Sequence, residues 1–263
     1  DARLALLRRA LPSVAAVVRP ALERAVERGV VWGRLDGVDD GALDDLAAGT
    51  LAATDGLAEA CLPRGHAEIL RACLATDATE GWPARLTLRW IGEVFRGAEM
   101  WRGVRSPLPA AWGATSFARA LAHFGAAVVW ASCPAGRPLA IHEHPWGARR
   151  AVIARLFGDV VAKPSFATRV LGLGRDRAET HVRALARARL AVLRVDALRL
   201  LLARQIRAGR RVLAEAHRDL GMRVFGAEPL ADACALLPAI GQDAAARFVA
   251  PLVATQRDRE LVE

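Results

Sequence analysis

Apolar residues recur at helical spacing from Gly174 to Leu220, a stretch that lies inside the longest part of the chain without proline. At about 100° per residue, the valine, leucine and isoleucine side chains of this stretch cover more than half of the circumference of a helix. A helix with so wide an apolar surface must be covered on several sides. We therefore predict one long helix over about 174–208, or two nearly collinear helices, because Gly209 bends or splits the far end.

One narrow stripe of this predicted helix is charged. Arg183, Arg187 and Arg194 fall within about 40° of one another at the helical period. We expect this stripe to face solvent or a ligand. Glu179 lies four residues before Arg183, which predicts an ion pair within the helix. His181 shares the sector of the apolar residues and is interpreted as a partly buried core histidine.

The remainder of the chain is also predicted to be mainly helical, because helical patterns recur between proline and glycine interruptions. Only the segment from Leu86 to Trp90 alternates in the manner of a strand, and one strand cannot form a sheet. The predicted fold is mainly α, a multi-helix bundle packed around one long central helix (about 174–208), with at most one or two short strands. The other predicted helical segments are 2–28, 50–78 with a break around Pro63–Gly65, 113–132, and 147–162.

A loop is predicted at 102–112, where Pro107 and Pro109 interrupt the helical pattern. This segment is the best candidate for a domain boundary. We expect a mildly acidic helical region at 1–105 and a helical region with a basic centre at 106–263, or one continuous domain. No apolar run approaches the roughly 18 residues needed to span a bilayer, and the first residues lack the order of a secretory signal. A cytoplasmic location is the default expectation.

Charge is unevenly distributed along the chain. The formal net charge is +9, and the segment 145–211 alone carries 16 basic and 4 acidic side chains. Such asymmetry favours an anionic partner. Two other origins stay open: a coding bias toward arginine, since Lys163 is the only lysine, or internal ion pairs with the acidic N-terminal region.

Arginine forks bind phosphate and carboxylate groups in a bidentate manner, which makes the basic segment a candidate binding face. We predict a non-catalytic helical interaction module whose basic face binds an acidic protein surface or a nucleic-acid backbone. The oligomeric state and any small-molecule substrate are not indicated by the sequence. The predicted binding residues are Arg149, Arg150, Arg183, Arg187 and Arg194.

The densest group of polar residues lies between Arg137 and Arg150 and suggests an alternative function. If residues 139–144 are extended, His142 and His144 project from the same face. Two histidines are the start of a zinc or iron site, which needs at least three ligands, and His181 is a candidate third ligand. Acid–base catalysis by His142, Glu143 and His144 without a metal is the other chemistry open to them. The alternative prediction is a metal-dependent hydrolase with its site near these residues.

The helix predicted at 113–132 contains the sequence AHFGAA from Ala122 to Ala127. This sequence resembles the His-Glu-Phe-Gly-His-Ala helix of thimet-oligopeptidase-like zinc peptidases. Phe124, Gly125 and Ala127 coincide with it, whereas the metal ligands and the general-base glutamate are missing. The resemblance implies a degenerate zinc-peptidase-like helix, which belongs to the same alternative function.

An acidic sequence, DDGALDD, begins at Asp39. It resembles the magnesium-diphosphate motifs of helical prenyl-transferring enzymes, but the second half of the chain has no comparable acidic cluster. The pattern instead favours a helix that is capped by Asp39 or Asp40 and carries Asp44 and Asp45 near its start.

Two smaller expectations concern single residues. His66 and Glu68 follow the Pro63–Gly65 break and are expected at an exposed turn and in the first helical turn after it.

The four cysteines are scattered without a Cys-x-x-Cys pair. This spacing predicts buried free thiols and no disulfide framework.

Overall fold

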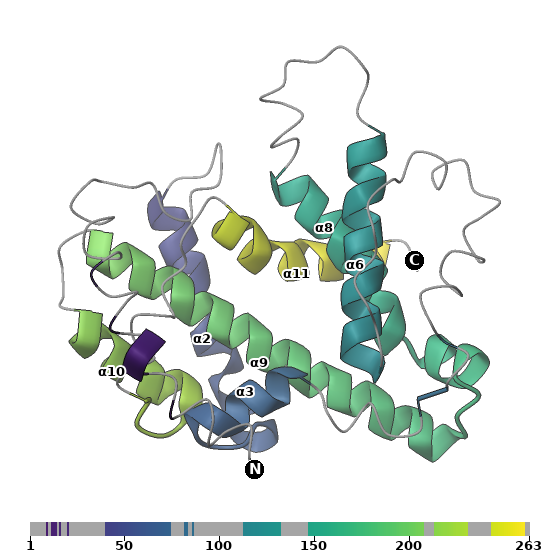
Figure 1. Cartoon of the computed structure of the whole chain (residues 1–263), viewed down its shortest axis with the longest axis horizontal. Coiled ribbons are helices and arrows are strands. Elements are labelled where there is room, and N and C mark those ends of the chain that lie inside the picture. Colours follow the sequence, from purple (N-terminus) through teal and green to yellow (C-terminus); the bar gives the residue numbers. More distant parts are fainter. Residues whose placement is uncertain are drawn as a thin grey trace. The chain divides into compact units, whose positions relative to one another are not determined.

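Helices are the only regular elements in the part of the chain that the computed structural model describes (Figure 1). This confirms the predicted mainly α fold. None of the described helices combines the length and the apolar character that a membrane span requires. The described residues are 9, 12–14, 16, 20, 40–74, 82–83, 86, 113–132, 147–207, 213–230 and 243–260. The elements are α2 (Asp40–Cys61), α3 (His66–Leu74), α6 (Gly113–Ala131), α8 (Gly147–Asp159), the short turns η2 (Val160–Ala162) and η3 (Phe166–Val170), α9 (Arg175–Arg207), α10 (Leu213–Phe225) and α11 (Asp243–Glu260).

Helix α9 is the longest described element, with 33 residues, and it confirms the helix predicted over about 174–208. It begins just after Gly172, whose positive φ of 70° suits the turn into the helix. Its leucines pack inward, and Leu198, Leu200 and Leu202 are fully buried. The helix ends at Arg207, and the next described helix begins at Leu213. The predicted break at Gly209 lies between these two ends, outside the described residues.

Contacts divide the chain into two compact units, and neither unit is continuous in sequence. Unit 1 consists of residues 1–73 and 190–248, and unit 2 consists of residues 74–189 and 249–263. The first half of α9 therefore belongs to unit 2, and its second half belongs to unit 1. The predicted boundary near residue 105 lies outside the described residues and stays a prediction.

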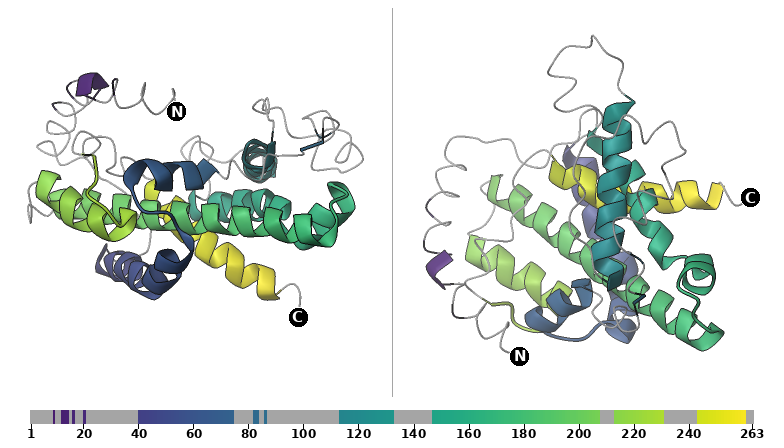
Figure 2. Two further views of the ribbon diagram at one scale, coloured as in Figure 1. Left: turned by 90° about the horizontal axis from the view of Figure 1, so that it is seen from below. Right: turned by 45° about the vertical axis from the view of Figure 1, so that its right-hand side comes forward.

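In unit 1, helix α2 and the second half of α9 run antiparallel. Asp44 near the start of α2 pairs with Arg204 near the end of α9, while Asp55 further along α2 pairs with Arg194. Helix α10 lies beside the same half of α9 (Figure 2). The core of this unit contains Leu43, Leu51, Ile69, Leu198, Leu201, Phe225 and Phe248.

The turn from α2 to α3 meets the C-terminal end of α10. Helix α2 ends two residues before Pro63, and Gly65 adopts a φ of 108°, so the predicted break at Pro63–Gly65 is confirmed. The Gly65 N–H donates to the carbonyl oxygen of Phe225 at 2.7 Å. Gly226 follows with a φ of 62° and donates its N–H to the Met222 carbonyl at 2.9 Å, as a glycine after a helix end commonly does.

In unit 2, helices α6 and α8 pack closely because glycines lie at their contact. A Cβ added at Gly125 of α6 would lie 2.9 Å from the ring of Phe157, and one at Gly158 of α8 would lie 3.0 Å from the Ala118 carbonyl oxygen. The rings of Phe124 and Phe157 meet edge to face at 5.7 Å. Any side chain larger than hydrogen at either glycine would force the two helices apart.

An aromatic cluster forms a second part of the unit 2 core. The rings of Trp82 and Phe117 lie 5.3 Å apart, and Phe166 of η3 lies 6.3 Å from Phe117. Leu86 is fully buried in the same cluster. Most of the segment predicted as a strand, including Trp90, lies outside the described residues, so that prediction is not decided.

Two cysteines are described, and they differ in environment. Both are free thiols, but Cys61 is exposed, so the prediction of buried thiols is wrong at this position. Cys61 is the last residue of α2, where the side chain reaches solvent. Burial raises the pKa of the half-buried Cys73 to about 12. Cys133 and Cys234 lie outside the described residues.

Candidate anion-binding surface

Four of the five arginines predicted to bind an anionic partner reach the surface of unit 2. Arg183 and Arg187 are exposed on the first half of α9. On α8, Arg149 is exposed and Arg150 is half-buried. These four residues therefore lie where a partner could contact them, on two different helices.

The fifth predicted residue, Arg194, is not part of this surface. It is only 1% exposed, so the prediction that it faces solvent or a ligand is wrong. Its guanidinium donates to the Leu51 carbonyl at 3.1 Å, to Thr54 Oγ1 at 2.7 Å and to Asp55 Oδ1 at 2.8 Å. A fourth hydrogen bond, of 3.1 Å, reaches the carbonyl oxygen of Arg223. The physical reason is that α2 and α10 cover this part of α9.

Arg194 belongs to a set of internal ion pairs in unit 1. Arg204 is 5% exposed and its Nε lies 3.1 Å from Asp44 Oδ1. Arg223 shares Asp55 with Arg194, at 2.7 Å from Oδ2. These hydrogen bonds, from Arg223 first and then from Arg194, lower the pKa of Asp55 and keep it ionised. Internal pairing with the acidic N-terminal region, one of the alternatives left open by the sequence, thus accounts for part of the arginine excess.

Exposed charge differs between the two units. Among the described residues, the exposed charged side chains of unit 1 are balanced, with five arginines (9, 64, 218, 223 and 247) and five carboxylates (45, 59, 215, 219 and 228). In the described part of unit 2, eight arginines are exposed against only two carboxylates, Asp176 and Glu179. Among the described residues, the excess of exposed positive charge therefore lies in unit 2. Its eight exposed arginines are 119, 149, 169, 175, 177, 183, 187 and 257.

The first half of α9 carries four of these arginines. Arg183 pairs with Glu179 one turn earlier, which confirms the predicted ion pair, and both side chains remain more than 60% exposed. Within the described part of the chain, Arg175, Arg177 and Arg187 take part in no ion pair. A guanidinium without a carboxylate partner keeps its hydrogen-bond donors for water or for a ligand.

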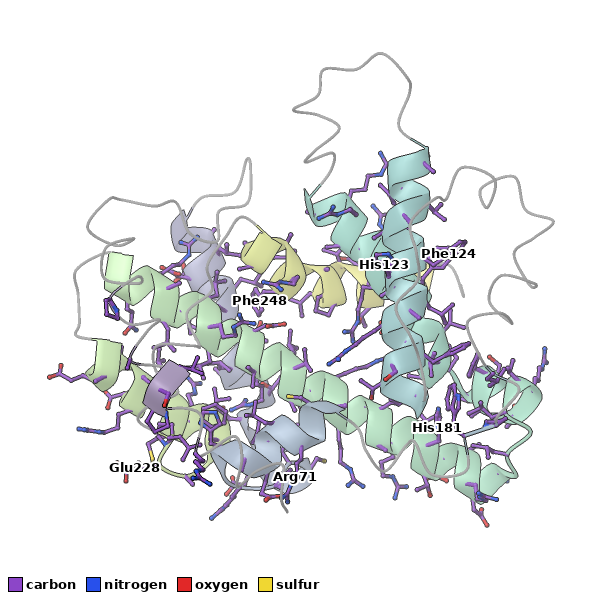
Figure 3. The ribbon with its side chains drawn as sticks, in the orientation of Figure 1. Arg71, His123, Phe124, His181, Glu228 and Phe248 are labelled. Carbon is purple, nitrogen blue, oxygen red and sulfur yellow. The ribbon has the colours of Figure 1, made fainter. Side chains whose placement is uncertain are left out.

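The candidate residues of the alternative function are mostly not described. His142, Glu143 and His144 lie outside the described residues. His181 is 6% exposed, and its Nε2–H donates to the Val161 carbonyl oxygen at 3.1 Å, which confirms a core histidine (Figure 3). Across the described residues, no group of three or more histidine, cysteine or acidic side chains could hold a metal ion.

In helix α6, the sequence from Ala122 to Ala127 that resembles a zinc-peptidase helix contributes to packing. Phe124 and Gly125 are buried against Phe157 of α8, while His123 is exposed (Figure 3). Alanines stand at the two positions where the resembling helix has metal ligands, and their methyl groups offer no donor atom. The residues of α6 therefore do not fit a zinc ion at these positions.

Sequence patterns did not reveal a buried histidine pair in unit 1. His66 is 6% exposed and stacks on Phe225 with ring centroids 4.1 Å apart, so the prediction that it lies at an exposed turn is wrong. His217 of α10 is 2% exposed, and its ring lies 6.4 Å from that of His66. Burial lowers the pKa of both rings, that of His217 to about 4. The partners of His66 come from residues about 150 positions later, which no local pattern indicates.

No protein-family model, curated protein or solved structure matches this chain.

Proposed function

We propose that this chain is a non-catalytic helical module that binds an anionic macromolecule through the exposed arginines of unit 2. The partner is an acidic protein surface or a nucleic-acid backbone. The observation that carries the proposal is the excess of eight exposed arginines over two exposed carboxylates in the described part of unit 2. A cytoplasmic location stays a prediction.

The first half of α9 is the centre of the proposed surface. Arg183 and Arg187 are separated by one helical turn, a rise of about 6 Å, and point to the same side. The ion pair of Arg183 with Glu179 is exposed, and such pairs contribute little to stability, so a phosphate or carboxylate can replace Glu179 at small cost. Arginine forks then contact the partner in a bidentate manner.

Salt dependence of binding tests this proposal. A fluorescent DNA duplex serves as the nucleic-acid ligand and labelled polyglutamate as the acidic-protein ligand, each titrated with the full chain at several salt concentrations. Affinity for at least one of them is expected to fall linearly on a logarithmic plot against salt. Arg183→Gln combined with Arg187→Gln should reduce the slope for DNA by about 2, because each arginine that neutralises a phosphate contributes roughly 0.9.

A control double variant has the same net charge as Arg183→Gln combined with Arg187→Gln. Arg218→Gln combined with Arg247→Gln removes two exposed arginines of unit 1 and should leave the slope unchanged. Equal losses in both double variants would assign binding to net charge alone and overturn the proposal. The proposal would also be overturned if neither DNA nor polyglutamate binds at low salt.

A further inference from the structure

Unit 1 contains a pocket of its own. Its volume is about 360 Å³, at the lower end of the range found for small-molecule sites. The end of α2, the turn into α3, Arg194 of α9 and the C-terminal end of α10 form its walls. All of its lining residues belong to unit 1.

The charges around this pocket do not cancel. Arg64, Arg194 and Arg223 line it, together with only two carboxylates, Asp55 and Glu59. Asp55 is shared by two of the arginines, since Arg194 and Arg223 each approach it within 2.8 Å. Arg194 is 1% exposed, and its Nε is buried without a hydrogen-bond partner. One cationic charge is therefore left over beside the pocket, and Arg194 cannot move into water to be solvated.

Arg64 is the arginine best able to receive a ligand. Its nearest carboxylate, Glu59, is 3.5 Å away, and both side chains are about three-quarters exposed, so this ion pair is weak. The stem of Arg64 lies over Gly226, where an added Cβ would be 3.2 Å from Arg64 Cγ. Glycine at 226 therefore lets the Arg64 guanidinium lie at the mouth of the pocket.

An apolar side chain completes the rim. Met222 is 46% exposed and lines the pocket one residue before Arg223. Methionine is flexible and polarisable, and it adapts to aliphatic and aromatic ligands. The pocket thus presents arginines beside an exposed apolar surface, an arrangement suited to a ligand with one anionic end and a short apolar body.

We propose that this pocket binds a small organic carboxylate. The carboxylate lies between Arg64 and Arg223, and the apolar body of the ligand covers Met222. A guanidinium can donate several hydrogen bonds to one carboxylate. Arg223 already donates to Asp55 Oδ2 from Nε at 3.1 Å and from Nη2 at 2.7 Å. None of the residues that line this pocket belongs to the proposed arginine surface of unit 2.

Methionine labelling gives a direct test with the full chain. The chain has only two methionines, so ¹³C-methyl labelling yields two signals, and Met100→Leu identifies the signal of Met222. Octanoate is expected to shift the Met222 signal in a saturable manner at millimolar concentration. Octanol has the same apolar body without the charge, and inorganic phosphate has charge without the body. Both should bind at least about tenfold more weakly, because each lacks one of the two recognised parts.

Two variants separate the pocket from general charge effects. Arg64→Gln should weaken octanoate binding about tenfold without changing the fold, because this side chain is exposed and weakly paired. Arg218→Gln, at an exposed arginine of α10 outside the pocket, should have no effect. Equal binding of octanoate by wild type and Arg64→Gln, equal binding of octanol, or the absence of a saturable Met222 shift would each overturn the proposal.

Discussion

Arg194 donates from Nη2 to Oδ1 of Asp55 at 2.8 Å and joins α9 to α2 across 139 positions of sequence. The arginine is fully buried, whereas the side chain of Asp55 is 42% exposed. Two backbone carbonyls and Thr54 take its remaining hydrogen bonds. The hydrogen bonds of this buried cation therefore connect α9 to both α2 and α10.

Replacing this arginine should be costly. Arg194→Met removes the donor to Asp55, to Thr54 and to two backbone carbonyl groups, and the loss is expected to be about 3 kcal/mol of unfolding free energy. Urea denaturation followed by circular dichroism measures it. Arg187→Gln, an exposed change on the same helix, should stay within about 0.5 kcal/mol of wild type. A similar small change for Arg194→Met would show that the buried network contributes nothing to stability.

The difference in exposure between Arg187 and Arg194 also shows what could be predicted from the sequence. The apolar period was sufficient to predict α9, because the pattern continues over many turns. Arg194 falls at nearly the same helical angle as Arg187, so the period alone placed both on one exposed stripe. Exposure differs because α2 and α10 cover the second half of α9, and this covering is a tertiary property. One signal in the sequence could have indicated this pairing. The spacing between Asp44 and Asp55 is nearly the same as that between Arg194 and Arg204, as two antiparallel helices joined by both ion pairs require.

Two glycines should respond to alanine in opposite directions. At Gly125, a Cβ would lie 2.9 Å from the Phe157 ring, so Gly125→Ala should destabilise the protein by about 1 to 3 kcal/mol. Gly49 lies within α2, is exposed and has no atom within 4 Å of an added Cβ. Gly49→Ala should therefore stabilise the protein by about 0.5 to 1 kcal/mol, since glycine is a poor helix former. Thermal melts of both variants show whether each substitution raises or lowers stability. A stabilising effect of Gly125→Ala would contradict the close packing of α6 on α8.

Acidic pH should lower the stability of the fold through the buried histidines His66 and His217. The pKa of His217 falls from an ordinary 6.5 to about 4 because the ring is buried, with a smaller contribution from His66. Between these values the unfolded chain binds a proton that the folded protein does not, so stability is full above pH 6.5 and declines as the pH falls toward 4. The loss from this residue is at most about 3 kcal/mol.

A single replacement tests that pH dependence. The Nε2 of His217 is buried and has no hydrogen-bond partner among the described residues, so His217→Leu should leave stability at pH 7 unchanged or raised. The same variant should lose much of the decline between pH 6.5 and 4, measured by denaturation at several pH values. His123→Gln, at an exposed position of unit 2, serves as the control and should keep the wild-type profile. An unaltered profile in His217→Leu would contradict the role given to this ring.

The interleaving of the two units along the chain constrains how the protein can be made. Unit 1 begins with the first residues but needs residues 190–248, which the ribosome adds only after residues 74–189. Unit 2 in turn needs residues from 249 onward. Neither unit can close before its later segment has been synthesised, and contacts between such distant residues slow folding. Helix α2, whose aspartates pair with Arg194 and Arg204, must therefore remain unpaired until those arginines have been synthesised, and chaperones would have access to its apolar face during that time.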